Sequence, residues 1–238
     1  MALTGLLVLG GASSGCAPSG RDAAVPPRPS ATPATTTTTT RPPAAGPQLD
    51  QMIVQPGDLP ANWVGRRPTP DPAQAANSAA FAKCLGIPNT NPNTVATARS
   101  PVFSLGSAQI TSLAASYRST SDVETDAAGL ASTKATACLS QLVQSQVTAT
   151  LPRGATVRNT LKVLPGAGSG PTNVVATVSG TVTITQKGGQ QGTLVESIVF
   201  MTGPRIEAQL VFVGLGQGVP AALRTALVEK MANRIAQG

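Results

Sequence analysis

VVATVSGTVTIT, residues 174–185, is the stretch of this sequence that decides the fold class. Apolar side chains recur at every second position, and threonine or serine fills most of the positions between them. One face is predicted to hold Val174, Ala176, Val178, Val182 and Ile184, and the other Thr177, Ser179, Thr181, Thr183 and Thr185. A period of two with one apolar face is typical of an antiparallel strand that packs on a core and meets water on its other side.

The residues after this strand predict two more strands and a helix. Gly188 and Gly189 turn the chain into a strand over 194–201, and Gly203–Pro204 turns it again. The next strand places Ile206, Ala208, Leu210 and Phe212 on one face. Pro220 then begins a final helix, whose inward residues are Leu223, Leu227, Met231 and Ile235.

The residues before it predict two helices and three strands. The first helix covers 72–85 and ends at Gly86. Strands are expected over 95–103, 108–117 and 155–164. A capping-box pattern at 121–124 begins the second helix, which ends before Pro152. Its inward stripe is Val123, Ala127, Ala131, Ala135, Cys138 and Leu142.

This order of elements indicates an α+β fold. We expect a single domain over residues 48–238, in which a twisted antiparallel sheet of about five to six strands packs against helices. A disordered N-terminal tether is expected before it, because residues 17–47 are rich in Thr, Pro and Ala, with threonine at every position from 35 to 40. Such a composition cannot bury enough apolar surface to offset its ordering entropy.

Residues 1–16 predict an export signal that ends at Cys16. A short apolar run is followed by small residues and the cysteine, and it is too short to span a bilayer. Its end resembles the lipobox of bacterial lipoproteins, which implies that Cys16 carries a diacylglyceryl group and a palmitate. Ser13 stands where that family usually has leucine, and no Lys or Arg precedes the run. We therefore expect an upstream start that encodes a basic residue. The alternative is an apolar N-terminus with an incidental cysteine.

The cysteines predict one disulfide. If Cys16 carries lipid, Cys84 and Cys138 are left as a pair on two helices, and an even remainder in an oxidising compartment favours a bond. Two buried free thiols are the alternative.

The sequence supplies no catalytic residue. It contains no histidine, which excludes Ser-His-Asp and Cys-His systems and the commonest metal ligand. The glycine run 214–218 lacks the following strand that a dinucleotide site needs. Asp122 and Asp126 would share a helix face and could present two carboxylates, but helix capping explains Asp122, Glu124 and Asp126 more simply. We expect no enzyme activity, no cofactor and no metal. The net charge of +7 is spread singly along the chain, which does not favour nucleic acid as a partner.

Two short motifs carry a family resemblance. DLPANW at 58–63 and FAKCLG at 81–86, together with Cys16 and the linker, resemble small actinobacterial, especially mycobacterial, cell-envelope lipoproteins. The order of elements is similar to the extracellular sensor domain of PknH-type kinases and to PsbP/Mog1-like lipoproteins. Those sensor domains have a second disulfide, which this chain cannot form. The resemblance implies no catalytic residue.

These observations predict a lipid-anchored, extracytoplasmic binding or sensing module of the cell envelope. It would be exported and held at the outer face of the cytoplasmic membrane, with an apolar small molecule, a wall component or an envelope protein as its partner. The alternative is a structural or accessory envelope protein that acts only through protein contacts.

We expect a ligand, if it binds internally, beneath the second helix. The small residues Ala127, Ala131 and Ala135 would face an apolar wall of Val178, Val182, Ile198, Leu210 and Phe212. Either a cavity or close packing fits this arrangement.

Overall fold

The structure is a computed structural model that describes residues 46–69, 72–166 and 173–237. The predicted signal, Cys16 and most of the predicted linker lie outside the described residues. The first helix, α1 (Gly46–Gln51), begins at the last two positions assigned to that linker. The fold is α+β, as predicted, and its sheet is antiparallel throughout.

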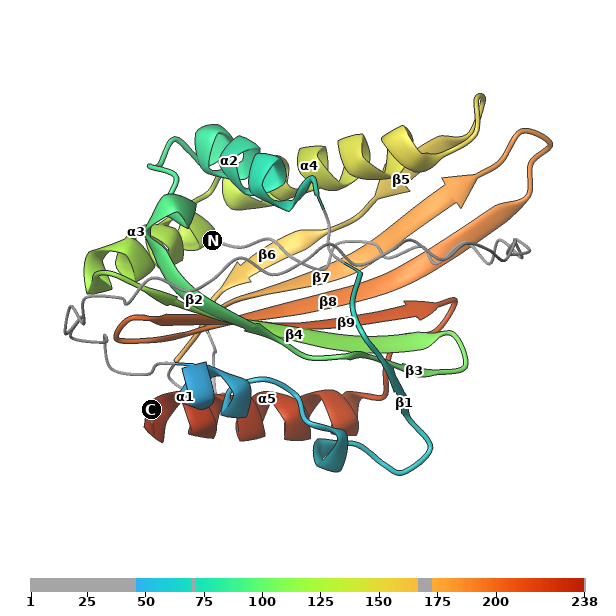
Figure 1. Ribbon diagram of the computed structural model, residues 1–238. Coiled ribbons are helices and arrows are strands. Elements are labelled where there is room, and N and C mark those ends of the chain that lie inside the picture. Colours follow the sequence, from blue (N-terminus) through green and yellow to red (C-terminus); the bar gives the residue numbers. More distant parts are fainter. Residues whose placement is uncertain (1–45, 70–71, 167–172, 238) are drawn as a thin grey trace, which may run out of the picture. The chain divides into compact units, whose positions relative to one another are not determined.

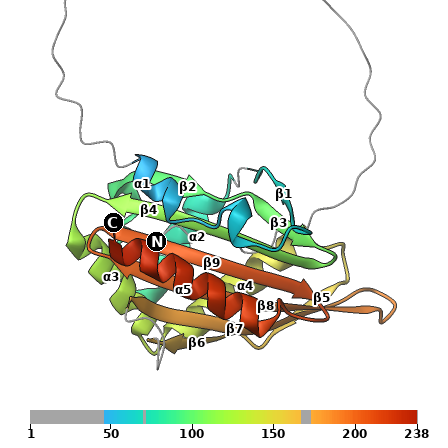
Figure 2. The same cartoon turned by 90° about the horizontal axis from the view of Figure 1, so that it is seen from below.

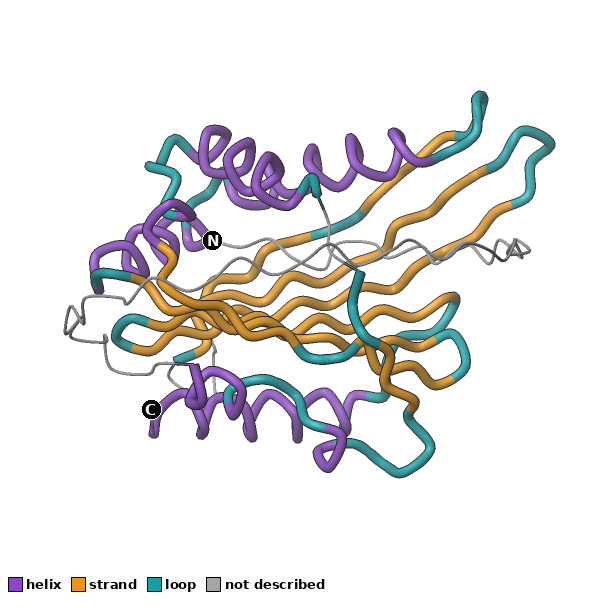
Figure 3. The backbone as a smooth tube through the Cα atoms, viewed as in Figure 1, coloured by secondary structure: helices purple, strands orange, loops and turns teal. Residues whose placement is uncertain are grey.

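Within the described residues the sheet has nine strands rather than five or six. Figure 3 shows how these strands lie between the helices. They are β1 (Val64–Arg66), β2 (Thr94–Arg99), β3 (Val102–Leu105), β4 (Ala108–Tyr117), β5 (Thr156–Asn159), β6 (Lys162–Pro165), β7 (Val174–Thr185), β8 (Gln191–Gly203) and β9 (Ile206–Leu215). Their order is β1-β3-β4-β9-β8-β7-β5, with β2 also pairing β4 and β6 also pairing β7. The long strands β7, β8 and β9 form its centre.

The extra strands have a local cause. The predicted strand over 95–103 is divided at Ser100–Pro101, since a proline cannot donate to the ladder of hydrogen bonds. The predicted strand over 155–164 is divided at Thr160–Leu161. Strand β1 is short and all three of its residues are exposed, so it has no apolar pattern that predicts it.

Helices cover both faces of the sheet (Figures 1 and 2). α2 (Gln74–Leu85), α3 (Thr120–Ala131) and α4 (Ala135–Thr150) lie over one face. α1 and α5 (Ala221–Gln237) lie over the other. Short 3-10 turns, η1 (Pro56–Asp58) and η2 (Asn91–Asn93), connect the early elements. No helix within these ranges is both long and apolar enough to cross a membrane.

The helix predicted to begin at the 121–124 capping box is two helices. Ser119, not Ser121, is the N-cap, and its Oγ accepts a hydrogen bond from the Asp122 backbone N–H at 3.3 Å. Ser132 adopts an extended conformation that ends α3, and the next helix, α4, begins at Ala135. The predicted stripe of small residues is therefore split between α3 and α4.

Each face of the sheet has its own apolar core. The α4 side contains Leu139, Val143, Val178 and Ile198, and the α5 side contains Phe103, Leu210, Phe212 and Met231, among other residues. Neighbouring residues of a strand point to opposite faces, so both cores draw on the same strands. A ligand site could therefore form on either side of the sheet, beneath α3 and α4 or beneath α5.

Candidate ligand pocket beneath the last helix

The register of β8 against β9 separates the residues predicted to form one apolar wall. Ile198 of β8 lies opposite Val211 of β9, so Val211 and not Leu210 shares its face. The predicted wall is divided accordingly, with Val178, Val182 and Ile198 on the α4 side and Leu210 and Phe212 on the α5 side.

The predicted alanines do not line a cavity large enough for a ligand. Ala127 and Ala131 belong to α3, and Ala131 is exposed, whereas Ala135 begins α4 and is fully buried in the core. The space beside Ala127 is about 10 Å³. That is close to the minimum of roughly 10–15 Å³ that holds one water molecule. The eight predicted residues therefore do not form one site, and the space beside Ala127 is too small for a ligand.

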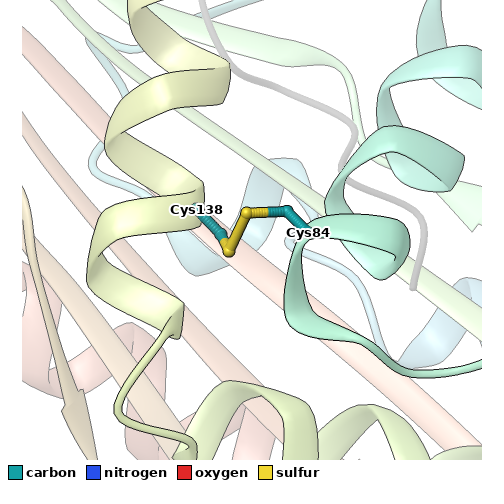
Figure 4. The surroundings of a disulfide bond; sticks show 2 residues. All are labelled: Cys84 and Cys138. Carbon is teal, nitrogen blue, oxygen red and sulfur yellow. A yellow bond between two sulfur atoms is a disulfide. The ribbon is translucent and has the colours of Figure 1, made fainter.

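The predicted cysteine pair is joined. Cys84 of α2 and Cys138 of α4 form a disulfide with a Cα–Cα distance of 5.7 Å (Figure 4). Cys138 is buried among the apolar residues of the α4 side. The bond therefore fastens the outer helix α2 to the helix that packs on the sheet.

A pocket of about 290 Å³ lies on the other side, between α5 and the sheet. We call it the α5 pocket. Its sheet side is formed by Val174 and Thr177 of β7, Ser197 and Val199 of β8, and Phe212 of β9. Phe212 is the one predicted ligand residue that lines it.

The strand register explains why these residues meet. Ser197 lies opposite Phe212, and Val199 lies opposite Thr177, so all four point to the α5 side. Val174 was predicted to share the face of Ala176, but an irregularity between these two residues turns it to the α5 side. The predicted alternation is wrong at that end of β7.

One flank of α5 forms the rest of the pocket. Leu227, Met231 and Ile235 are buried in the core. The adjacent flank, at spacings of three and four residues, consists of Ala221, Arg224, Thr225, Val228 and Glu229. Helical geometry thus places a second stripe beside the core stripe, and this second stripe covers β7 and β8.

The pocket combines an apolar floor with few polar groups. Arg224 is half-buried, and its Nε is buried without a hydrogen-bond partner among the described residues. Ser197 is buried at the floor, and Glu229 is exposed. The chain has no histidine to activate the Ser197 hydroxyl. Such a space can bind a small molecule and orient it through a few polar contacts.

A second group of polar side chains is buried where α3 meets β4 and β9. The Tyr117 hydroxyl donates to Glu207 Oε2 at 3.1 Å, and Thr90 Oγ1 donates to Asp126 Oδ2 at 2.5 Å. Burial raises the pKa of Glu207 to about 8, and the nearby Asp126 carboxylate adds to this rise. Burial also raises the pKa of Tyr117 above its usual range. A side-chain hydrogen bond between Glu207 and Asp126 joins α3 to β9. The space beside this group, about 10 Å³, is too small for a ligand.

Glu196 is a further buried acid, on the α4 side of β8. It lies opposite Gly180 and Val213, and only 3% of its surface is exposed. Burial raises its pKa to about 7. Its strand position is on the face away from the α5 pocket, so it takes no part in that site. Within the described ranges, no cluster of His, Cys, Asp and Glu could hold a metal ion.

Comparisons of the chain with protein-family models, with curated proteins and with solved structures found no match. The resemblance to envelope lipoproteins and PknH-type sensor domains therefore stays a prediction from short motifs. A functional interpretation has to be built from the α5 pocket itself.

Proposed function

We propose that this protein is a non-enzymatic binding module of the cell envelope, and that the α5 pocket is its ligand site. One observation carries the proposal: a space of about 290 Å³ lies between α5 and the sheet, floored by Val174, Val199 and Phe212. Small-molecule pockets range from roughly 300 to 1,000 Å³ and are mostly apolar with a few placed polar groups. The α5 pocket, at about 290 Å³, is just below the lower end of that range.

The contrast between the two faces supports a binding role. Protein interiors normally leave few voids larger than a water molecule. The space beside Ala127 of α3 follows this rule, since its volume is only about 10 Å³. Unfilled apolar space lowers stability, because the lining side chains lose packing partners. The space of about 290 Å³ beneath α5, which is partly open to solvent, leaves apolar side chains of the sheet without packing partners, and this supports a ligand at that place.

The envelope location rests on the sequence. Cys16 would carry the lipid, and the Thr/Pro/Ala-rich segment 17–47 would hold the domain away from the outer face of the cytoplasmic membrane. The disulfide between Cys84 and Cys138 is in keeping with an oxidising compartment. In this arrangement the module presents its pocket to envelope molecules near its own anchor.

Binding of a neutral fluorophore to the full chain tests the proposed pocket. N-phenyl-1-naphthylamine carries no charge and gains fluorescence in apolar surroundings, so it reports on the floor independently of Arg224. Thr225→Trp, from the exposed rim of the pocket, should fill the space and abolish the fluorescence gain.

Ala226→Trp is the matched control, because Ala226 is also exposed on α5 but does not line the pocket. It should bind the fluorophore as the wild type does. Absence of saturable binding to the wild type, or equal binding by the two tryptophan variants, would contradict the proposed site.

A further inference from the structure

We propose that the α5 pocket is selective for a monoanionic amphiphile, whose carboxylate pairs with Arg224 and whose apolar chain lies on the floor of the pocket. This inference rests on the proposed function and names the ligand class of the same site. It is carried by the position of Arg224, by the charges around it and by the apolar lining.

The first step is the contrast between two arginines of α5. Arg234 donates three hydrogen bonds, two to the Asp58 carboxylate and one to the Ile53 carbonyl. Arg224 lies on the same helix, lines the pocket, and has a buried Nε without a hydrogen-bond partner in the described part of the chain. A buried donor without an acceptor costs free energy. A ligand oxygen that accepts from this Nε therefore contributes more binding free energy than the same oxygen would at an exposed arginine.

The second step concerns Glu229, the other charged residue of the pocket. It is five positions after Arg224, and residues five apart on a helix do not face each other as those three or four apart do. The structure contains no ion pair between these two described residues. The guanidinium is therefore not neutralised by its own helix.

The two charges also limit the charge of the ligand. With Arg224 and Glu229 both lining the pocket, the side chains contribute one positive and one negative charge. A monoanion can pair with the guanidinium while its chain separates it from Glu229. A dianionic phosphate would have two negative charges and only one arginine to pair with, and Glu229 would repel it as well. A carboxylate also matches the planar fork of the guanidinium.

The residues that line the pocket indicate the chemistry of the rest of the ligand, beyond its carboxylate. Val174, Val199, Phe212 and Val228 supply apolar contact, and the hydroxyls of Thr177 and Ser197 lie among them. The volume of about 290 Å³ suits a medium-length acyl chain better than a long one. The geometry points to a medium-chain fatty acid or an equivalent carboxylate.

Displacement of N-phenyl-1-naphthylamine from the full chain separates this inference from the proposed function. The probes are decanoate, decanol and decyl phosphate, which share one chain and differ in the head group. The wild type should bind decanoate at least about tenfold more tightly than decanol, as expected for one charge-assisted hydrogen bond. Decyl phosphate should bind more weakly than decanoate.

Arg224→Gln should reduce decanoate binding to the level of decanol and leave decanol unchanged. Arg205→Gln is the matched control, because Arg205 is exposed in the β8–β9 turn, and it should keep the preference. Glu229→Gln should tighten decanoate binding by removing the repulsion.

The outcomes distinguish the two proposals. Equal binding of decanol and decanoate, or a preference that survives Arg224→Gln, would overturn the carboxylate assignment while the pocket stands. Tighter binding of decyl phosphate would replace the carboxylate by a phosphate head group. Loss of the preference in Arg205→Gln would indicate a general effect of charge and overturn the role of Arg224. A wild type that binds neither fluorophore nor amphiphile would overturn both proposals.

Discussion

Arg234 and Asp58 form a bidentate ion pair that joins the two ends of the folded domain. Arg234 Nη1 donates to Asp58 Oδ2 at 2.8 Å, and Nη2 donates to Oδ1 at 2.7 Å. Lys230 Nζ also lies 2.7 Å from Oδ1. The pair connects η1 with the last turns of α5, 176 positions later in the chain. It therefore fixes the helix that covers the α5 pocket.

The Asp58 pair predicts a loss of stability in acid. Burial alone would raise the pKa of Asp58, but hydrogen bonds from Arg234, Lys230 and the Gln55 backbone N–H outweigh it and lower the pKa from 3.8 to about 2. The stabilisation is therefore complete above pH 3.8 and is lost as the pH falls towards 2. With allowance for solvent around the half-exposed Lys230, it amounts to about 1–2 kcal/mol.

Asp58→Asn tests this prediction. Urea unfolding at pH 6 should show a loss of about 1–2 kcal/mol, and the difference from the wild type should shrink as the pH falls to 2.5. Asp50→Asn changes an exposed carboxylate of α1 and should have little effect. The prediction fails if the two variants are equally stable at pH 6.

The disulfide predicts a strong dependence of stability on redox state. Cys84 and Cys138 are 54 positions apart, and closing a loop of that length contributes about 4 kcal/mol in the chain-entropy model. Replacing both cysteines by alanine should lower the free energy of unfolding by several kcal/mol. Reduction with dithiothreitol should lower the stability of the wild type and leave the double variant unchanged. A wild type that is insensitive to the reductant, with both thiols free to labelling, would contradict the bond.

Glu207 should make the stability of the fold fall as the pH rises, which is the opposite of the effect of Asp58. Its pKa is raised from 4.5 to about 8, so the folded protein holds this proton over a range in which the unfolded chain releases it. The stabilisation is complete below pH 4.5 and is lost as the pH rises to about 8. Glu207→Gln keeps a donor toward Asp126 without titrating. It should flatten the decline between pH 5 and 8 by on the order of 3 kcal/mol.

Urea unfolding at both pH values measures this decline. Glu196, with a pKa raised to about 7, acts in the same direction, so the variant should keep part of it. Glu124→Gln, from the exposed side of α3, is the control and should follow the wild type. An unchanged decline in Glu207→Gln would show that Glu207 is ionised in the folded protein.

The position of Gly180 is predicted to tolerate no side chain. It lies on β7 where the chain crosses from β5 to β6, and a Cβ there would be 2.7 Å from the Thr160 carbonyl oxygen and 2.8 Å from the Leu161 Cα. These are backbone atoms and cannot rotate away. Gly180→Ala should cost about 1–3 kcal/mol in thermal or urea unfolding. Gly192→Ala on β8 is the control, because its nearest neighbour would be 4.0 Å away. Equal stability of the two variants would contradict the close contact.

The sequence predicts the elements of this fold better than their arrangement. Alternation and turn glycines place β7, β8 and β9, and Gly86 ends α2 as predicted. The break at Thr160–Leu161 has no such signal, because both residues are compatible with a strand. It follows from the approach to Gly180, which is a tertiary contact.

Most of the candidate site cannot be predicted from the sequence, for the same reason. Alternation shows which residues of one strand share a face. It does not show which residues of the neighbouring strand lie on the same side of the sheet. The register of Ile198 with Val211 decides that, and it separates Phe212 from Val178 and Val182. Arg224 looks like an ordinary surface charge in the sequence, since nothing local indicates that its Nε is covered.

The position of α5 in the chain has a consequence for biogenesis. α5 follows the nine strands of the described residues, so the α5 face of the sheet is without this helix while the strands are synthesised. Val199 and Phe212, which line the α5 pocket, therefore lack their cover until α5 is made. Asp58, made early, meets Arg234 only when the helix arrives. A chain stopped before α5 would present an apolar sheet face, which is a surface that chaperones bind and that aggregates readily.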